Sequence, residues 1–153
     1  MTGTRNGRRR WGTVHASESL LVRAPAERLA ALYMDHAHWN RLFPATIRGT
    51  RLLRQAPDET VVEVDHRTEG PVTNVIRPLS PTAIELDEFK PKFDATFVNR
   101  FEPVAEGTRY VVDAEVRLRM PYAIVAPLVG GLVRRRVRRY VLEPMRAAAE
   151  ASP

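Results

Sequence analysis

The stretch GLVRRRVRRYVLEPM, residues 131–145, decides the fold because it is both strongly basic and regularly apolar. Arginine fills five of the six positions 134–139, and Val137 interrupts the run. In an α-helix, with about 100° between successive residues, the apolar side chains of this stretch share one face. This apolar stripe consists of Val133, Val137, Tyr140, Val141, Pro144 and Ala148. The pattern predicts a long amphipathic helix with Arg135 and Arg139 opposite the stripe.

Two parts of this predicted helix are less regular. Pro144 has no amide hydrogen, so it predicts a kink one turn before the carboxyl end. Leu142 falls on the polar side of the stripe, and the pattern gives no reason for it. Before the helix, the segment PYAIVAPLVGG, residues 121–131, is apolar but contains Pro127 and two consecutive glycines. Proline and glycine interrupt regular structure, so this segment is expected to be an irregular lead into the helix.

The chain before residue 45 predicts one strand and two short helices. Residues 14–22, VHASESLLV, are rich in apolar residues without a helical period, which favours a strand. In APAERLAALYMD, residues 24–35, Pro25 suits the first helical position and apolar residues recur at helical spacing. The next piece, HAHWNRLFP, residues 36–44, predicts a second short helix or turn that stops at Pro44.

Residues 47–120 contain no long helical pattern and instead predict six antiparallel strands joined by short turns. The turn signals are PDE (57–59), EGP (69–71), LSP (79–81), KPK (90–92) and AEG (105–107). The clearest strand, RYVVDAEVRLRM, residues 109–120, alternates apolar side chains with mostly charged ones. Residues 61–67 and 93–101 also alternate. This alternation predicts a sheet with one apolar face and one face toward water.

Length and composition fit one globular domain. A chain of 153 residues buries roughly two thirds of its unfolded surface, which is enough for a core. We expect a single domain at residues 13–150, preceded by a basic, disordered tail at residues 1–12. The absence of cysteine excludes disulfides and Cys-based zinc sites, and no run approaches the ~20 apolar residues of a membrane-spanning helix. A soluble, cytoplasmic protein is therefore expected.

The order of the predicted elements resembles that of the START/Bet v 1-like (SRPBCC) superfamily, which includes the bacterial polyketide cyclase/dehydrase and Coq10-like families. The stretches that carry the resemblance are VRAPAERLAAL (22–32), HWNRLFP (38–44), EPVAEGTRYVV (102–112) and MPYAIVAPLVGGLVRRRVRRYV (120–141). The resemblance implies an α+β helix-grip fold. In this fold a curved antiparallel sheet of about seven strands wraps around the long C-terminal helix, and two short helices follow the first strand.

The resemblance also implies a function, because members of this superfamily hold a lipid, isoprenoid, steroid or aromatic polyketide in a cavity between the sheet and the last helix. We expect the protein to bind a hydrophobic small molecule as a carrier or sensor, without a cofactor. The alternative is an aromatase/cyclase or dehydratase that acts on a polyketide-like substrate. The expected ligand-binding residues, with the first two at the entrance, are Trp39, Phe43, His66, Phe97, Asn99, Tyr110, Val112, Ala114, Val133, Val137, Tyr140 and Val141. The same apolar side chains would also suit a solid core.

Few polar residues offer chemistry. His36 and His38 lie close together in a short connection, where solvent-exposed histidines are favoured over a metal site. His66 lies at the end of an otherwise apolar strand face. Three roles are open for it: a general base, a group that orients a ligand, or an inward-facing polar residue that has a hydrogen-bond partner. Arg67 falls on the charged outer face, unless a bulge turns it inward. The inferred inner faces carry no paired carboxylates and no nucleophile motif, so no catalytic or metal-binding residue is assigned.

The arginine run at residues 134–139 raises the question of whether the protein binds a nucleic acid or an anionic membrane. Aromatic residues for base stacking are not interleaved with these arginines, so no specific nucleic-acid partner is expected. A net charge of +6, from 24 basic and 18 acidic residues, permits an anionic partner without requiring one. Peripheral contact with an anionic membrane suits the arginine run better, because each arginine near the membrane surface contributes about 1 kcal/mol to the free energy of membrane binding.

Overall fold

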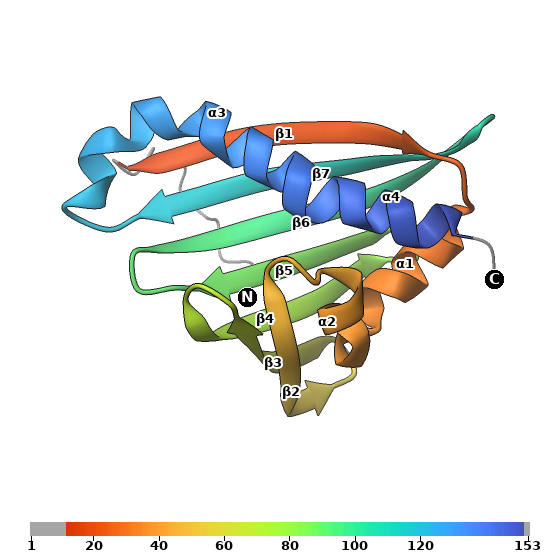
Figure 1. Ribbon diagram of the computed structural model, residues 1–153, viewed down its shortest axis with the longest axis horizontal. Coiled ribbons are helices and arrows are strands. Elements are labelled where there is room, and N and C mark those ends of the chain that lie inside the picture. Colours follow the sequence, from red (N-terminus) through yellow and green to blue (C-terminus); the bar gives the residue numbers. More distant parts are fainter. Residues whose placement is uncertain (1–11, 152–153) are drawn as a thin grey trace, which may run out of the picture.

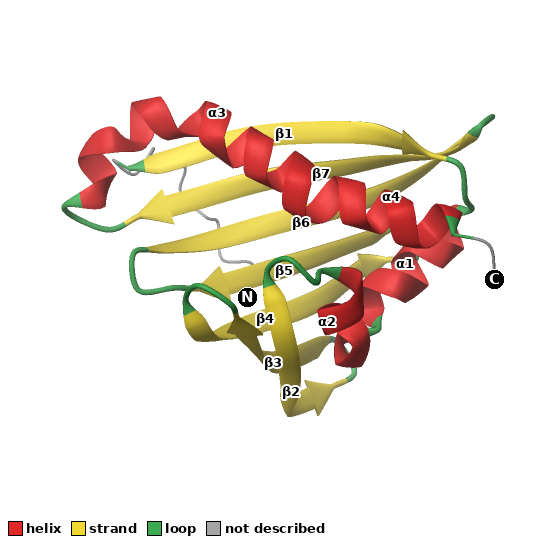
Figure 2. Cartoon of the chain, viewed as in Figure 1, coloured by secondary structure: helices red, strands yellow, loops and turns green. Residues whose placement is uncertain are grey.

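In a computed structural model that describes residues 12–151, the protein forms one seven-stranded antiparallel sheet with a long helix across one face (Figures 1 and 2). The strands are β1 (Thr13–Val22), β2 (Ile47–Ala56), β3 (Glu59–His66), β4 (Gly70–Ser80), β5 (Ala83–Phe89), β6 (Phe93–Val104) and β7 (Gly107–Leu118). Their order across the sheet is β1-β7-β6-β5-β4-β3-β2. The predicted basic tail, residues 1–12, lies outside the described residues except for Gly12.

The helices lie in two parts of the chain. After β1 come α1 (Ala26–Met34), a 3-10 turn (His36–His38) and α2 (Trp39–Leu42). After β7 come a 3-10 helix (Tyr122–Val125), α3 (Ala126–Val137), a π-helical turn (Arg138–Leu142) and α4 (Glu143–Glu150). In Figure 1 this C-terminal helix crosses the sheet diagonally, with α3 near β1 and α4 beside α1. The predicted α+β architecture, with two short helices after the first strand, is confirmed.

The hairpins form where turn residues interrupt the strand patterns. Each of the five predicted turn signals lies at a junction between consecutive strands, and four of them overlap a strand end by one or two residues. At the turn from β6 to β7, Gly107 has a φ angle of 142°, and a Cβ atom there would lie 2.3 Å from the carbonyl oxygen of Val22. Only glycine fits this position, because any side chain would collide with backbone. The absence of a side chain at Gly107 therefore allows this turn to lie directly against the end of β1.

The alternation within the strands sorts side chains between the two faces of the sheet as predicted. On β3, Val62 and Val64 are fully buried, whereas the intervening Glu63 is part exposed. On β7, Val112 and Ala114 are buried and face the helix side. Alternate residues of a strand point to opposite faces, so the helix side of the sheet is mainly apolar.

The helix register changes at the π-helical turn, which explains Leu142. The amide of Glu143 donates to the carbonyl of Arg138, five residues back rather than four. A π turn holds an additional residue, so it rotates the following side chains relative to a straight α-helix. Leu142, expected on the polar side, is fully buried, and the apolar stripe continues through Met145 and Ala149. Pro144 and Ala148, which were expected on the stripe, are therefore only partly buried, and Ala148 packs against the edge of the core.

The lead into the C-terminal helix is more regular than predicted. α3 begins at Ala126, so Pro127 and the glycine pair lie inside a helix rather than in an irregular segment. Pro127 is tolerated because amides in the first helical turn have no carbonyl partner within the helix. Packing of α3 on β1 stabilises the rest, and a Cβ atom at Gly130 would lie 3.9 Å from Val14 Cγ1, at an ordinary contact distance. Tertiary contact here overrides the low helix propensity of glycine.

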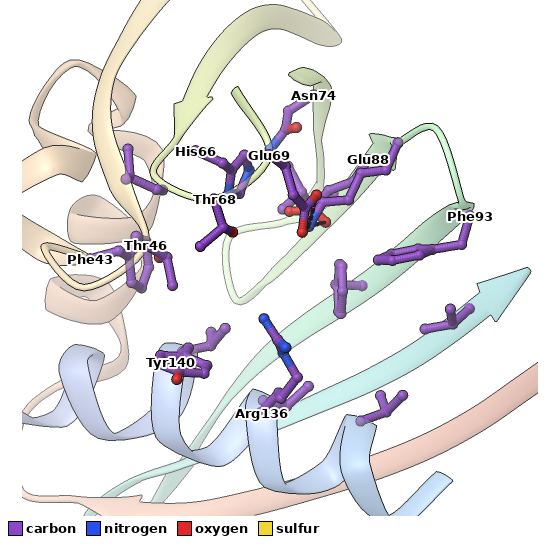
Figure 3. A pocket seen from close by; sticks show the side chains of 18 of the residues that line it. Phe43, Thr46, His66, Thr68, Glu69, Asn74, Glu88, Phe93, Arg136 and Tyr140 are labelled. Atoms are coloured by element: carbon purple, nitrogen blue, oxygen red, sulfur yellow. Dashed lines mark hydrogen bonds and ion pairs between the residues drawn. The ribbon is translucent and has the colours of Figure 1, made fainter. Parts of the chain in front are cut away.

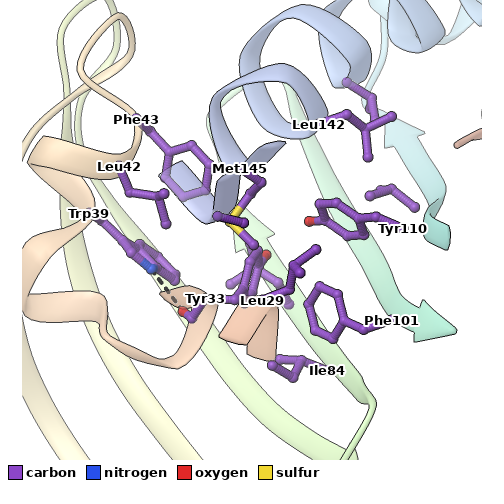
Figure 4. Packing of buried hydrophobic residues seen from close by; sticks show 14 of the residues in the cluster. Leu29, Tyr33, Trp39, Leu42, Phe43, Ile84, Phe101, Tyr110, Leu142 and Met145 are labelled. Carbon is purple, nitrogen blue, oxygen red and sulfur yellow. Dashed lines mark hydrogen bonds between the residues drawn. The ribbon is translucent and has the colours of Figure 1, made fainter. Parts of the chain in front are cut away.

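The larger cluster of buried hydrophobic residues lies where α4, α1 and α2 meet the sheet (Figure 4). Tyr33 packs edge-on against Trp39 with 5.7 Å between ring centroids, and the Trp39 indole nitrogen donates to the Tyr33 carbonyl at 2.9 Å. Buried Tyr110 donates its hydroxyl to Asn99 Oδ1 at 2.6 Å. The indole of Trp39 and the hydroxyl of Tyr110 therefore have hydrogen-bond partners within the core.

Candidate ligand-binding site

A pocket of about 280 Å³ separates α3 and the π-helical turn from the apolar face of the sheet (Figure 3). Its apolar lining comprises Trp39, Phe43, Ile47, Leu86, Phe93, Phe97, Val116, Leu118, Val129, Leu132, Val133, Val137 and Val141, with Tyr33 and Tyr140. Its polar lining comprises Thr46, His66, Thr68, Glu69, Asn74, Glu88, Lys90 and Arg136. Mostly apolar walls with a few polar groups are typical of small-molecule sites.

Eight of the twelve residues expected to contact a ligand line this pocket. They are Trp39, Phe43, His66, Phe97, Val133, Val137, Tyr140 and Val141. Trp39 and Phe43 were expected at the entrance, but they are only 2 % and 7 % exposed and lie at its buried end. They are buried because they pack against each other and against Tyr33, in T-shaped ring pairs.

The other four expected residues, Asn99, Tyr110, Val112 and Ala114, lie in the packed core and not on the pocket wall. Strand alternation places them on the expected face, but the helix covers the two ends of that face differently. Along β7 the residues up to Ala114 are packed in the main core, whereas Val116 and Leu118 line the pocket. The alternation along a strand predicts which face of the sheet a side chain lies on, but it does not predict how far that face lies from the covering helix.

One end of the pocket is polar, and carboxylates lie there. Lys90 Nζ lies 3.1 Å from Glu69 Oε2 and 3.5 Å from Glu88 Oε2. The side chains of Lys90 and Glu88 are only 11 % and 13 % exposed and that of Glu69 is 32 % exposed, so the Lys90–Glu88 pair is the largely desolvated part of this network. The expectation of no paired carboxylates on the inner face was therefore wrong. The sequence does contain a signal for Glu88. In the strand AIELDEF, residues 83–89, every second residue lies on the same face, so Glu88 lies on the same face as Leu86.

Two buried polar atoms in the lining have no hydrogen-bond partner among the described residues. They are His66 Nε2 and Asn74 Oδ1. Burial lowers the pKa of His66 below its ordinary value of 6.5, more strongly than the nearby Glu88 carboxylate raises it. The imidazole is therefore neutral at pH 7 and can donate or accept a hydrogen bond. Unpartnered buried polar groups are uncommon in native proteins, so these two atoms point to a bound molecule or water.

The helix side of the pocket contributes Arg136 and Tyr140. The Arg136 guanidinium carbon lies 5.5 Å from the centre of the Tyr140 ring, within the range of a cation–π interaction. In Figure 3 Arg136 extends from the helix toward the polar end formed by the strands. Arg136 is exposed, so the pocket reaches the surface here.

The remaining polar candidates lie away from the pocket. His38 Nδ1 pairs with Asp35 Oδ2 at 2.8 Å in an exposed position. Arg67 is exposed, and its Nε donates to the carbonyl of Pro44 at 2.8 Å, so it ties the turn after β3 to the end of α2. Within residues 12–151, no group of three or more His, Cys, Asp or Glu side chains has the arrangement of a metal site.

Comparison with known proteins identifies the fold. No protein-family model and no curated protein matches the sequence. The chain superimposes on the aromatase/cyclase Zhui from Streptomyces sp. R1128 with a TM-score of 0.70 and 17% identity, over 90% of this chain and 94% of that one. A START superfamily protein from Mycobacterium smegmatis gives a TM-score of 0.70 and 17% identity, over 89% and 97% of the two chains. The fold is the helix-grip fold of START/Bet v 1-like proteins.

The helix-grip domain also matches proteins of greater length. The di-domain ARO/CYC BexL from the BE-7585A biosynthetic pathway gives a TM-score of 0.74 and 18% identity over 95% of this chain. The chain spans about half of the length of the di-domain proteins that it matches, 52% of BexL and 51% of StfQ from the steffimycin pathway. At these sequence identities, the structural similarity shows only that the chain has the helix-grip fold. Other proteins with this fold include aromatase/cyclases and lipid transfer proteins.

Proposed function

We propose that the protein binds a small, mainly apolar molecule in the pocket beneath α3, as a carrier or sensor. The observation that supports this most directly is a mostly apolar pocket with two unpartnered buried polar atoms at one end. The volume of about 280 Å³ is near the lower end of the roughly 300–1,000 Å³ usual for ligand pockets. The apolar wall provides affinity, and the polar end orients the molecule.

Blocking the pocket tests this proposal. In Val129→Trp a large ring replaces a pocket-lining side chain, so binding of an apolar naphthalene fluorophore should fall by at least about tenfold. Leu128→Trp is the matched control, because Leu128 is the adjacent residue but is 83 % exposed. Solvent extraction of purified protein followed by mass spectrometry should recover an apolar molecule that is chemically unchanged. Equal binding by wild type and both variants would place the fluorophore outside the pocket and contradict the proposal.

A second candidate is catalysis on a polyketide-like substrate, as in the aromatase/cyclases of the same fold. The observation that favours it is a neutral His66 that shares the pocket with Glu88, since neutral imidazole is a good general base. Incubation with a linear poly-β-ketone mimic should then give multiple turnovers to a cyclised product. His66→Gln should reduce turnover by about a hundredfold, or about 2.7 kcal/mol. Recovery of the unreacted mimic would favour the carrier or sensor.

A membrane is the partner that we propose for loading the carrier. Six large apolar side chains, the apolar cap, are exposed near the start of the C-terminal helix: Met120, Tyr122, Ile124, Val125, Leu128 and Leu132. Contiguous exposed apolar side chains mark interaction surfaces. Leu132 also lines the pocket, so the cap is continuous with the proposed ligand route. Within residues 12–151, no helix is long and apolar enough to cross a bilayer, so the proposed contact is peripheral.

Charge favours an anionic bilayer for this surface. Arg135 and Arg139 are exposed on the same helix, and basic residues beside an apolar face are typical of interfacial helices. Phosphatidylcholine vesicles containing phosphatidylglycerol should therefore sediment more protein than vesicles of phosphatidylcholine alone. Leu128→Asp should abolish sedimentation, and the Arg135→Glu/Arg139→Glu variant should reduce it. Leu79→Asp, at an apolar residue that is 54 % exposed outside the cap, should not change it. A dimer that Leu128→Asp dissociates would instead assign the cap to a second copy.

A further inference from the structure

Asn74 occupies an unusual position in the polar end of the pocket. It lies on the pocket face of β4 and is only 2 % exposed, yet its Oδ1 atom has no partner in residues 12–151. Its partner in the register with β5 is Glu88, which also lines the pocket. A buried amide oxygen without a hydrogen bond costs stability, so it requires a donor from outside the protein.

The neighbouring groups do not provide that donor. Glu88 and Glu69 are acceptors when ionised, and Lys90 Nζ lies between these two carboxylates. Water can satisfy Asn74 in the empty pocket, but a ligand that displaces the water must replace its hydrogen bond. An ether, a ketone or a carboxylate only accepts hydrogen bonds and would leave Oδ1 unpartnered. A protonated amine donates, but burying another charge in this network carries a larger desolvation cost than burying a neutral group.

His66 does not impose the same restriction. Its Nε2 atom is also buried and unpartnered. A neutral imidazole nitrogen donates in one tautomer and accepts in the other, so His66 binds either a hydroxyl or a carbonyl. Of the two unpartnered atoms, Asn74 Oδ1 is therefore the one that selects among ligands.

We propose that the pocket is specific for apolar molecules that carry an alcohol or phenol hydroxyl, which donates a hydrogen bond to Asn74 Oδ1. This specificity rests on the proposed binding function and adds the chemical class of the ligand to it. The apolar walls surround the body of the molecule, and its hydroxyl lies at the end that contains Asn74 and Glu88.

Three probes that share one ring system distinguish the contribution of the hydroxyl from that of apolar contact: naphthalene, methoxynaphthalene and naphthol. Calorimetric titration of the wild-type protein should give a dissociation constant for naphthol at least about tenfold below those of the other two. Methoxynaphthalene is larger than naphthol and naphthalene is smaller, so a preference for naphthol over both does not come from size. In Asn74→Leu, which keeps similar volume but has no acceptor, the preference should fall below about threefold.

Val129→Ala is the matched control, because Val129 lines the apolar wall. It should weaken all three probes by a similar factor and preserve the preference for naphthol. Thermal melting of each variant verifies that the titrated protein is folded. Equal affinity of the wild type for naphthol and methoxynaphthalene, or a preference that persists in Asn74→Leu, would overturn the proposed specificity while leaving the binding function intact. If none of the probes binds, the binding function itself fails.

Discussion

The two halves of the C-terminal helix cover the same sheet in different ways. From the end of the π-helical turn through α4, Leu142 and Met145 are fully buried against a core that contains closely packed aromatic rings. Beneath α3 the helix and sheet enclose a pocket, and Leu128 and Leu132 are 83 % and 51 % exposed. One half of the interface is packed as core, and the other half encloses a pocket.

The difference shows that one apolar face of a strand can form packed core at one end and the wall of a pocket at the other. β7 contributes Tyr110 and Val112 to the solid half and Val116 and Leu118 to the pocket. Nothing in the alternation marks the change, because it depends on how far the helix lies from each part of the strand. Substitutions in the two halves are expected to separate stability from ligand affinity, and four predictions test this separation.

The largest effect is expected at Val137, where the two halves meet. Val137 is 5 % exposed, belongs to the main core and also lines the pocket. Val137→Asp buries a charge without a partner and should destabilise the fold by at least about 4 kcal/mol, with loss of ligand binding. Arg135→Glu, on the exposed side of the same helix, should change the free energy of unfolding by no more than about 0.5 kcal/mol. Chemical denaturation measures both, and similar destabilisation by the two would show that the helix faces are wrongly assigned.

Next in size is the contrast between two leucines, one in each half. Leu142→Ala should cost about 2–5 kcal/mol, because it leaves a cavity in the solid core. Leu132→Ala should cost less than about 1 kcal/mol and mainly weaken ligand binding, because Leu132 is half exposed and lines the pocket. Urea denaturation and ligand titration of both variants test the contrast. An equal loss of stability would mean that the α3 half is as solid as the α4 half.

A smaller contrast is expected between two tyrosines. Tyr110→Phe removes the hydroxyl that donates to Asn99 Oδ1 and leaves that buried oxygen without this partner, at a cost of about 1–3 kcal/mol. Ligand affinity should not change, because neither residue lines the pocket. Tyr140→Phe, on the part-exposed pocket wall, should change stability by less than about 0.5 kcal/mol. A shift in ligand affinity in Tyr110→Phe alone would extend the site into the solid half.

The smallest effect is a pH dependence in the pocket half. Burial lowers the pKa of His66 in the folded protein below the ordinary 6.5, so the unfolded chain binds a proton more readily. The contribution of His66 to stability is therefore complete above pH 6.5 and is lost as pH falls through the lowered folded pKa. Melting temperatures between pH 8 and pH 5 should fall more steeply in the wild type than in His66→Gln. The carboxylates are common to both proteins, so identical slopes would show that His66 titrates as it does in the unfolded chain.

The sequence by itself determined the order of elements, the turns and the inward faces of the strands, because these follow from local periodicity and from glycine and proline. The alternation that buries Val62 and Val64 and the stripe through Val133 and Val137 are properties of neighbouring residues along the chain. The same counting, applied to residues 83–89, would have placed Glu88 inside.

Tertiary structure alone decided which apolar residues pack as core and which line a pocket. Asn99 and Phe97 lie on the same face of β6, but Asn99 hydrogen-bonds within the solid core and Phe97 lines the pocket. The burial of Leu142 likewise follows from one additional residue in the π-helical turn, which a regular helical period does not contain. Both outcomes depend on how the helix and the sheet pack across the core, and residues far apart in the sequence determine that packing.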